Sequence, residues 1–149
     1  MSTNTTLNDI VRNLFAAQPL GILATRGSGY PYCTIVAFTP SDDLRYLLIA
    51  TPRGTSKYNN ILQNPGVSLM VDNRSASKPD FTNGIAVSCL GRALTVPEPE
   101  FEACRKLHFE RHAHLRIHLD SPDCALVRIA VERYIIARGV RQIETLSMM

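Results

Sequence analysis

Near its middle the chain passes from a buried strand straight into a helix, and this transition restricts the possible folds more than any other stretch. Residues 44–51 (LRYLLIAT) form a short apolar run rich in Leu, Ile and Tyr, which is typical of a buried strand. Pro52 to Gly54 interrupt the run. A helix is predicted directly afterwards, with Thr55 or Ser56 as its N-cap and residues 64–65 (NP) as its end.

Lys57 is an unexpected residue for the first turn of this helix. A helix N-terminus carries roughly half a positive charge, so a cation there costs about 0.3–1 kcal/mol. Arg53 brings a second cation nearby. A bound phosphate would reverse the sign, because it would meet unpaired N–H groups, hydroxyls and cations together. On these residues alone two interpretations stay open, a phosphate site and a solvated lysine that tolerates the dipole.

Composition indicates one soluble globular domain over residues 1–149. The chain is 45% hydrophobic and 19% charged, and no apolar run approaches the roughly 20 residues needed to span a bilayer. The N-terminus lacks a basic region followed by an apolar core, so we expect a cytoplasmic protein without membrane attachment. The net charge is +3 and the arginines are spread along the chain, which gives no support to a nucleic-acid surface.

The cysteines are scattered and form no C-x-x-C pair, which argues against a zinc ribbon and a dithiol redox motif. They are Cys33, Cys89, Cys104 and Cys124. We expect free thiols in the core.

Four histidines lie close together in the sequence and raise the question of a metal or haem. They are His108, His112, His114 and His118, of which the first two would share a helix face at i, i+4. The string HFERH matches no zinc-protease motif. We therefore expect surface or interface histidines and predict no metal site, with a metal or haem role as the alternative.

The remaining segments predict short strands with a few helices between them. Strands are expected over residues 20–25, 30–38, 66–71, 84–96 and 123–137, and helices from Thr5 or Thr6 to about Ala17 and from about 98 to 111. Residues 39–43 read as a turn, the first three strands as a β-meander, and residues 72–83 as a polar loop holding Arg74 and Lys78. Gly91 predicts a bulge that helps the sheet to close. The pattern favours a mainly β (α+β) fold, an antiparallel barrel with peripheral helices.

A series of short segments, in this order, resembles the pyridoxamine 5′-phosphate oxidase-like, FMN-binding split-barrel superfamily. The segments are LAT (23–25), YPYCTIVAF (30–38), AT (50–51), TSK (55–57), NPGVSL (64–69), VDNR (71–74) and IAVSCLGRA (85–93). The resemblance covers about residues 7–96 well and the remainder loosely.

The resemblance implies a six-stranded antiparallel split β-barrel that forms a homodimer, with FMN held between the subunits. Main-chain groups along the isoalloxazine ring would come from Tyr32, Cys33 and Thr34. The flavin phosphate would be bound by Thr51, Thr55, Ser56 and Lys57, with Arg53 and Arg74 as further candidates. The unusual position of Lys57 then has a cause.

The chain also departs from the enzyme that oxidises vitamin B6. That enzyme carries an R-x-H pair near its C-terminus and a Trp near the flavin, whereas this chain has no Trp and no such pair in residues 137–142. We therefore expect an FMN-dependent oxidoreductase acting on a small organic molecule or a nicotinamide donor, with unidentified catalytic residues. The alternative is a non-catalytic flavin, deazaflavin or haem binding or storage protein of the same fold.

Overall fold

The computed structural model describes the backbone of residues 3–75 and 80–149, and the side chains of residues 7–75 and 82–149. The helices are α1 (Thr3–Ala17), α2 (Ser56–Gln63), α3 (Asp80–Asn83), α4 (Glu98–Arg111) and α5 (Arg116–Leu119), with a 3-10 turn η1 (Ala113–Leu115). The strands are β1 (Leu20–Thr25), β2 (Tyr32–Ala37), β3 (Thr39–Pro40), β4 (Tyr46–Pro52), β5 (Gly66–Asp72), β6 (Ile85–Thr95), β7 (Cys124–Arg138) and β8 (Gln142–Ser147). Among the described helices none is both long and apolar enough to cross a membrane.

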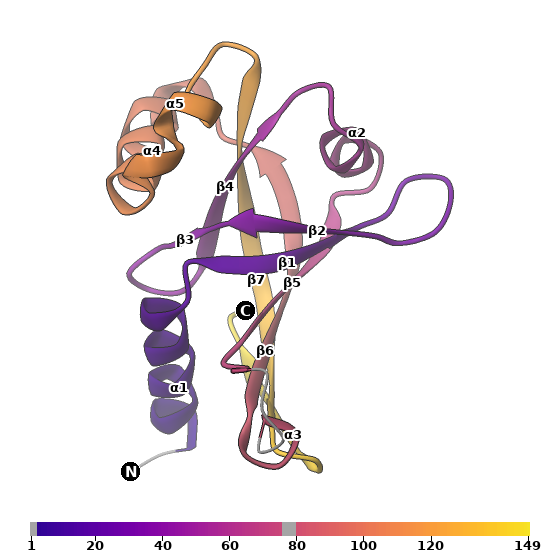
Figure 1. Ribbon diagram of the computed structural model, residues 1–149, viewed down its shortest axis with the longest axis vertical. Coiled ribbons are helices and arrows are strands. Elements are labelled where there is room, and N and C mark those ends of the chain that lie inside the picture. The colour runs from indigo at the N-terminus through magenta and orange to yellow at the C-terminus, as the bar shows by residue number, and fades with distance from the viewer. Residues whose placement is uncertain (1–2, 76–79) are drawn as a thin grey trace.

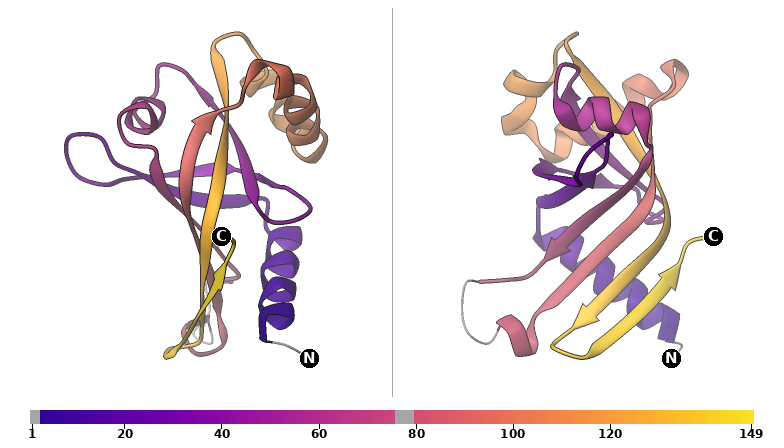
Figure 2. Two further views of the ribbon diagram at one scale, coloured as in Figure 1. Left: turned by 180° about the vertical axis from the view of Figure 1, so that it is seen from behind. Right: turned by 90° about the vertical axis from the view of Figure 1, so that its right-hand side faces the viewer.

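The described strands form one antiparallel sheet that curls into a split barrel. Its order is β2-β1-β5-β6-β7-β4-β3, and β8 pairs with β7 outside this path. Figures 1 and 2 show α2, α4 and α5 gathered around one end of the sheet, while α1 runs along the other half. The predicted fold class is therefore confirmed, and the six predicted strands correspond to β1, β2, β4, β5, β6 and β7.

Alternating side chains explain how the strands enclose one core. Along β5, Val67, Leu69 and Val71 are buried, whereas Met70 between them is exposed. Helix α1 closes the core with a helical stripe that includes Val11 and Phe15.

The chain closes the barrel where β2 continues into β3. β2 pairs with β1 at one end of the strand order, and β3, which follows after Phe38, pairs with β4 at the other end. The β-meander prediction was wrong, because β4 pairs with β7 and not with β2. Strands adjacent in sequence are here separated by the corner at Phe38.

Several boundaries also differ from those predicted. Helix α1 begins at Thr3, before the expected cap, and the predicted turn at 39–43 contains β3. Strand β8 was missed, and the predicted loop at 72–83 contains α3. Lys78 of that loop lies outside the described residues.

The bulge predicted at Gly91 is confirmed. The register of β6 against β7 shifts between Leu90 and Gly91, so that Leu90 faces Arg133 and Gly91 faces Val131. Gly91 is required here, because a Cβ at this position would lie 2.3 Å from the carbonyl oxygen of Ala130.

Candidate functional site

The turn from β4 into α2 is held by two threonines. Thr55 is the N-cap of α2, and its Oγ1 accepts a hydrogen bond of 3.3 Å from the backbone N–H of Tyr58, as predicted for this position. Thr51 lies at the end of β4 and is fully buried. Its hydroxyl oxygen is 3.0 Å from that of Thr55, so the two hydroxyls form a hydrogen bond. Thr51 therefore positions the cap and has no surface of its own to offer a ligand.

The first turn of α2 presents donors without acceptors. Within the described residues the backbone N–H groups of Ser56 and Lys57 have no hydrogen-bond acceptor. The Lys57 side chain is half-buried and has no carboxylate partner in the described part of the chain, and burial lowers the pKa of its ammonium group. Charge, N–H groups and desolvation at this helix start all favour an anion.

Arg53 adds a second cation beside the same turn. Its guanidinium donates to the Tyr58 hydroxyl at 3.3 Å and lies 6.0 Å from the centre of the Tyr58 ring. The side chain is exposed but is drawn toward the start of α2.

The edge of β2 provides main-chain groups. β2 is the last strand of the sheet order, so over Tyr32–Ala37 its second edge faces no strand in the described chain. The Thr34 hydroxyl is buried and has no hydrogen-bond partner in the described structure. The Cys33 thiol is exposed, so the expectation that all the cysteines lie in the core was wrong for this residue, although all four are free.

Two contacts bring the start of β2 and helix α2 to the same end of the sheet. Tyr32 pairs with Thr25 of β1, and the Thr25 hydroxyl accepts a hydrogen bond of 3.1 Å from the Asn60 amide of α2. The structure thus gathers the predicted residues of β2 and of the β4–α2 turn around one end of the barrel.

Arg74 is not part of this group within one chain. It follows β5, where Met70 pairs with Ile22, and so lies beyond the opposite end of β1 from Thr25. At about 3.3 Å per residue, the length of β1 corresponds to roughly 16 Å. Its guanidinium forms an ion pair of 2.8 Å with Asp72.

Sequence patterns did not reveal an exposed apolar face on β2, β1 and β5. Its members, here called the apolar face, are the exposed side chains of Leu20, Ile35 and Met70 and the partly exposed side chain of Ile22. Ile35 is 72% exposed, and Ile22 pairs with both Ile35 and Met70, so these side chains lie on one side of the sheet. The available signal was that β1 lacks polar residues on its outer face, where Leu20 and Ile22 lie.

The histidine prediction was wrong for two of the four residues. His108 and His112 are buried, because α4 lays them against the corner between β2 and β3. His108 Nδ1 lies 2.8 Å from Thr39 Oγ1, and His112 Nε2 donates to the Phe38 carbonyl at 2.7 Å. His108 Nε2 and His112 Nδ1 have no partner in the described structure. Burial lowers the pKa of both imidazoles, that of His108 to about 4.

His114 and His118 are exposed, as expected. No three metal-ligating side chains come together among the described residues.

A sequence model of pyridoxamine 5′-phosphate oxidase matches residues 7–136. The chain belongs to this oxidase family. The match extends well beyond the residues 7–96 that carried the resemblance. No curated protein matches the chain by sequence.

Solved structures show how widely the fold of this oxidase family is shared. A haem-binding protein from Mycobacterium smegmatis superposes with a TM-score of 0.80 at 20% identity, covering 91% of this chain and 55% of its own. The chain thus spans only about half of that protein. An FAD-binding protein from Mesorhizobium loti gives a TM-score of 0.69 at 20% identity over 87% of this chain and 90% of its own. General stress protein 26 from Bacillus anthracis gives a TM-score of 0.72 at 19% identity, over 95% of this chain and 98% of its own.

Proposed function

We propose that this member of the oxidase family binds FMN at the start of α2 and along β2, and acts as a flavin-dependent oxidoreductase on a small organic molecule or a nicotinamide donor. The observation that carries the proposal is Lys57, a desolvated cation without a carboxylate partner in the described chain, set in the first turn of a capped helix. A flavin phosphate, which carries close to two negative charges, would offset the unfavourable position of this cation.

Four groups around the turn have the chemistry to hold a phosphate. The N–H groups of Ser56 and Lys57 and the Ser56 hydroxyl would donate hydrogen bonds, and the Lys57 ammonium would supply charge. Arg53 would add a second cation from beside Tyr58. Thr51 and Thr55 would act indirectly, by holding the turn in shape.

The free edge of β2 supports a site for the flavin ring. On the edge of β2 that points away from β1, the backbone groups of Tyr32, Cys33 and Thr34 face no strand in the described chain, and the Thr34 hydroxyl is buried without a partner there. A planar ring with acceptors and donors along its edge would satisfy such groups. A bound flavin would supply the acceptance of a hydride or electrons, while the protein would orient the ring and exclude water.

We further propose that the functional unit is a homodimer joined through the apolar face. Exposed, contiguous apolar side chains on a sheet are typical of an interaction surface, and Ile35 and Met70 are at its centre. A two-fold axis through that centre, lying in the interface and perpendicular to β1, would bring each end of the face against the opposite end of the second copy. Arg74, which lies far from Lys57 in its own chain, could then approach the Tyr32 end of the other copy.

The buried histidines weaken the haem alternative. His108 and His112 each use one ring nitrogen within the fold, and both rings are covered by protein. A haem iron ligated by histidine would need one of the exposed imidazoles, His114 or His118.

The experiment is a titration of the protein, stripped of any copurified cofactor, with FMN, followed by quenching of flavin fluorescence. Wild-type protein should bind one FMN per chain. Lys57→Ala should raise the Kd at least about tenfold, because a charge-assisted contact is lost.

Lys106→Ala is the matched control, since Lys106 is exposed on α4 beside Glu110. Its Kd should equal that of the wild type. Absence of saturable FMN binding by the wild type, or equal losses in the two lysine variants, would refute the phosphate site. Steady oxidation of NADH or NADPH with an added electron acceptor would then separate an oxidoreductase from a storage protein.

A further inference from the structure

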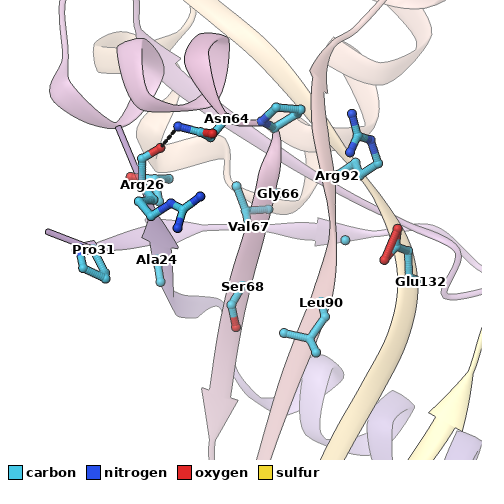
Figure 3. A pocket seen from close by; sticks show the side chains of 13 residues that line it. Ala24, Arg26, Pro31, Asn64, Gly66, Val67, Ser68, Leu90, Arg92 and Glu132 are labelled. Carbon is cyan, nitrogen blue, oxygen red and sulfur yellow. Dashed lines mark hydrogen bonds between the residues drawn. The ribbon is translucent and has the colours of Figure 1, made fainter. Parts of the chain in front are cut away.

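A groove on the outer side of the sheet has the size of a small-molecule site. It lies at the C-terminal end of α2 and has a volume of about 530 Å³. Its floor crosses three neighbouring strands, mostly at residues with little or no side chain, namely Ala24, Gly66, Ser68 and Gly91, with Leu90 beside Ser68. Figure 3 shows the floor flanked by longer side chains on both sides. Ligand sites of this volume accommodate small organic molecules.

The groove has one basic wall on each side. Arg26, at the end of β1, stands on one side, and Arg92 of β6 stands on the other (Figure 3). Neither guanidinium has an ion pair or a hydrogen bond within the part of the chain that the structure describes. Two unpaired cations lining one hollow favour an anionic occupant.

A carboxylate is turned into the same groove by the β-bulge. Because Leu90 faces Arg133 and Gly91 faces Val131, Glu132 is the extra residue of β7 at the bulge. Bulges re-aim side chains in this way. Glu132 lines the groove, and its carboxylate has no cationic partner among the described residues.

The loop that carries Arg26 and Pro31 is held by hydrogen bonds from the residue that ends α2. The Asn64 amide donates to the backbone carbonyls of Arg26 at 2.9 Å and of Gly27 at 3.2 Å. The first of these bonds is visible in Figure 3. The backbone on the Arg26 side of the groove is therefore held in place before any ligand arrives, which lowers the entropic cost of binding.

We propose that this groove binds a small organic acid that has a flat apolar body and a hydroxyl or amine donor. The acid group would lie between Arg26 and Arg92, the body would rest on the small-residue floor, and the donor would bond to Glu132. The two guanidinium groups and the carboxylate of the groove are then all satisfied by one molecule.

This groove is separate from the phosphate end of the proposed flavin site and adjoins its ring end. Ala24 and Ser68 point to the outer side of the sheet together with Cys33, which pairs with Ala24, whereas Thr34 pairs with buried Leu23 and points to the inner side. The groove also adjoins the C-terminal end of α2, whereas Lys57 lies at its N-terminal end.

The probe for this proposal is 4-hydroxybenzoate, titrated into the protein as purified and followed by calorimetry and by backbone amide NMR shifts. Saturable binding should shift the resonances of Gly66, Ser68 and Gly91. Arg26→Gln and Arg92→Gln should each raise the Kd at least about tenfold. Glu132→Gln should weaken 4-hydroxybenzoate but leave benzoate, which lacks the hydroxyl, unchanged.

A steric variant tests the location without changing charge. A Cβ at Gly66 meets no atom within 4 Å, so Gly66→Leu should fold normally and fill the groove. Gly29→Leu is the matched control, because a Cβ there is equally free and Gly29 does not line the groove. Binding should be lost in the first variant and kept in the second.

Three results would overturn the proposal. The first is no saturable binding of 4-hydroxybenzoate. The second is displacement of the acid by equimolar FMN, which would make the groove part of the flavin site. The third is a change in oligomeric state on Gly66→Leu, which would show that a second copy of the chain occupies the groove.

Discussion

Histidines 108 and 112 are neutral groups in a place where a charge could not be solvated. Each ring is buried and uses one nitrogen to hold the corner at Phe38 and Thr39, leaving the other nitrogen without a partner in the described structure. Protonation would place a second cation near Arg111 and the other imidazole, which the structure disfavours.

The fold should therefore lose stability in mild acid. The unfolded chain protonates His108 near pH 6.5, whereas the folded chain resists protonation down to a pKa of about 4. Stability should be unaffected by this group above pH 6.5 and should fall between pH 6.5 and 4, by up to about 3 kcal/mol. Urea unfolding at a series of pH values measures this slope.

His108→Gln should flatten the dependence between pH 6.5 and 4, since glutamine does not titrate. His118→Gln, which changes an exposed imidazole, should leave the slope as in the wild type. Equal slopes in all three proteins would contradict the assignment. Carboxylates with lowered pKa values, such as Asp120 beside Arg105, act only at lower pH.

At the scale of single elements, the candidate site depends on the N-cap of α2, where Thr55 contacts both the helix and Thr51. Thr55→Ala should destabilise the protein by about 1 kcal/mol, because the Tyr58 N–H loses its acceptor and Thr51 loses its neighbour. FMN affinity should fall with it. Ser56→Ala, whose hydroxyl caps nothing in the described structure, should leave the urea midpoint unchanged. An unaltered midpoint in Thr55→Ala would show that the cap is not needed.

The β-bulge is a second element with a sharp requirement. Gly91→Ala would force a methyl group against the Ala130 carbonyl oxygen and should cost about 1–3 kcal/mol in thermal or urea unfolding. Gly66→Ala, where the added methyl group meets no atom within 4 Å, is the control and should unfold at or above the wild-type midpoint. A midpoint for Gly91→Ala equal to that of the control would mean that the strands can slide past each other at the bulge.

The sequence predicted elements well where local chemistry decides them. The cap at Thr55 and the end of α2 at Asn64 depend on residues adjacent in the chain, and the bulge was signalled by Gly91 itself in the middle of a strand pattern. Pairing of distant strands could not be predicted, because the corner at Phe38 depends on His112 of α4, and the partner of β4 is β7, far along the chain. Strand β8 escaped notice because it is an edge strand, with Leu146 buried but Ile143 exposed, so its apolar pattern is incomplete.

The candidate site shows the same division. The dipole conflict at Lys57 pointed to the start of α2, whereas the burial of Thr51 and the remoteness of Arg74 follow from tertiary packing. The two buried histidines were misjudged, because i, i+4 spacing identifies a shared helix face without indicating what covers it.

For the molecule as a whole, the apolar face predicts self-association. Ile35→Glu should convert a dimer into a monomer, because a charge would be buried at the centre of the interface, and FMN binding should weaken with it. Sedimentation velocity measures the change. Ile117→Glu on α5, where the side chain is 86% exposed, should leave the assembly intact. A wild-type protein that sediments as a monomer would rule out the interface.

The corner at Phe38 has a consequence for the order in which the chain acquires its shape during synthesis. The N-terminal half emerges from the ribosome with β1, β2 and β4 complete, yet β4 must await β7, which is made some 70 residues later. The corner likewise awaits the histidines of α4. We expect the nascent chain to stay protease-sensitive until residues 124–138 have left the exit tunnel, and then to become resistant in one step.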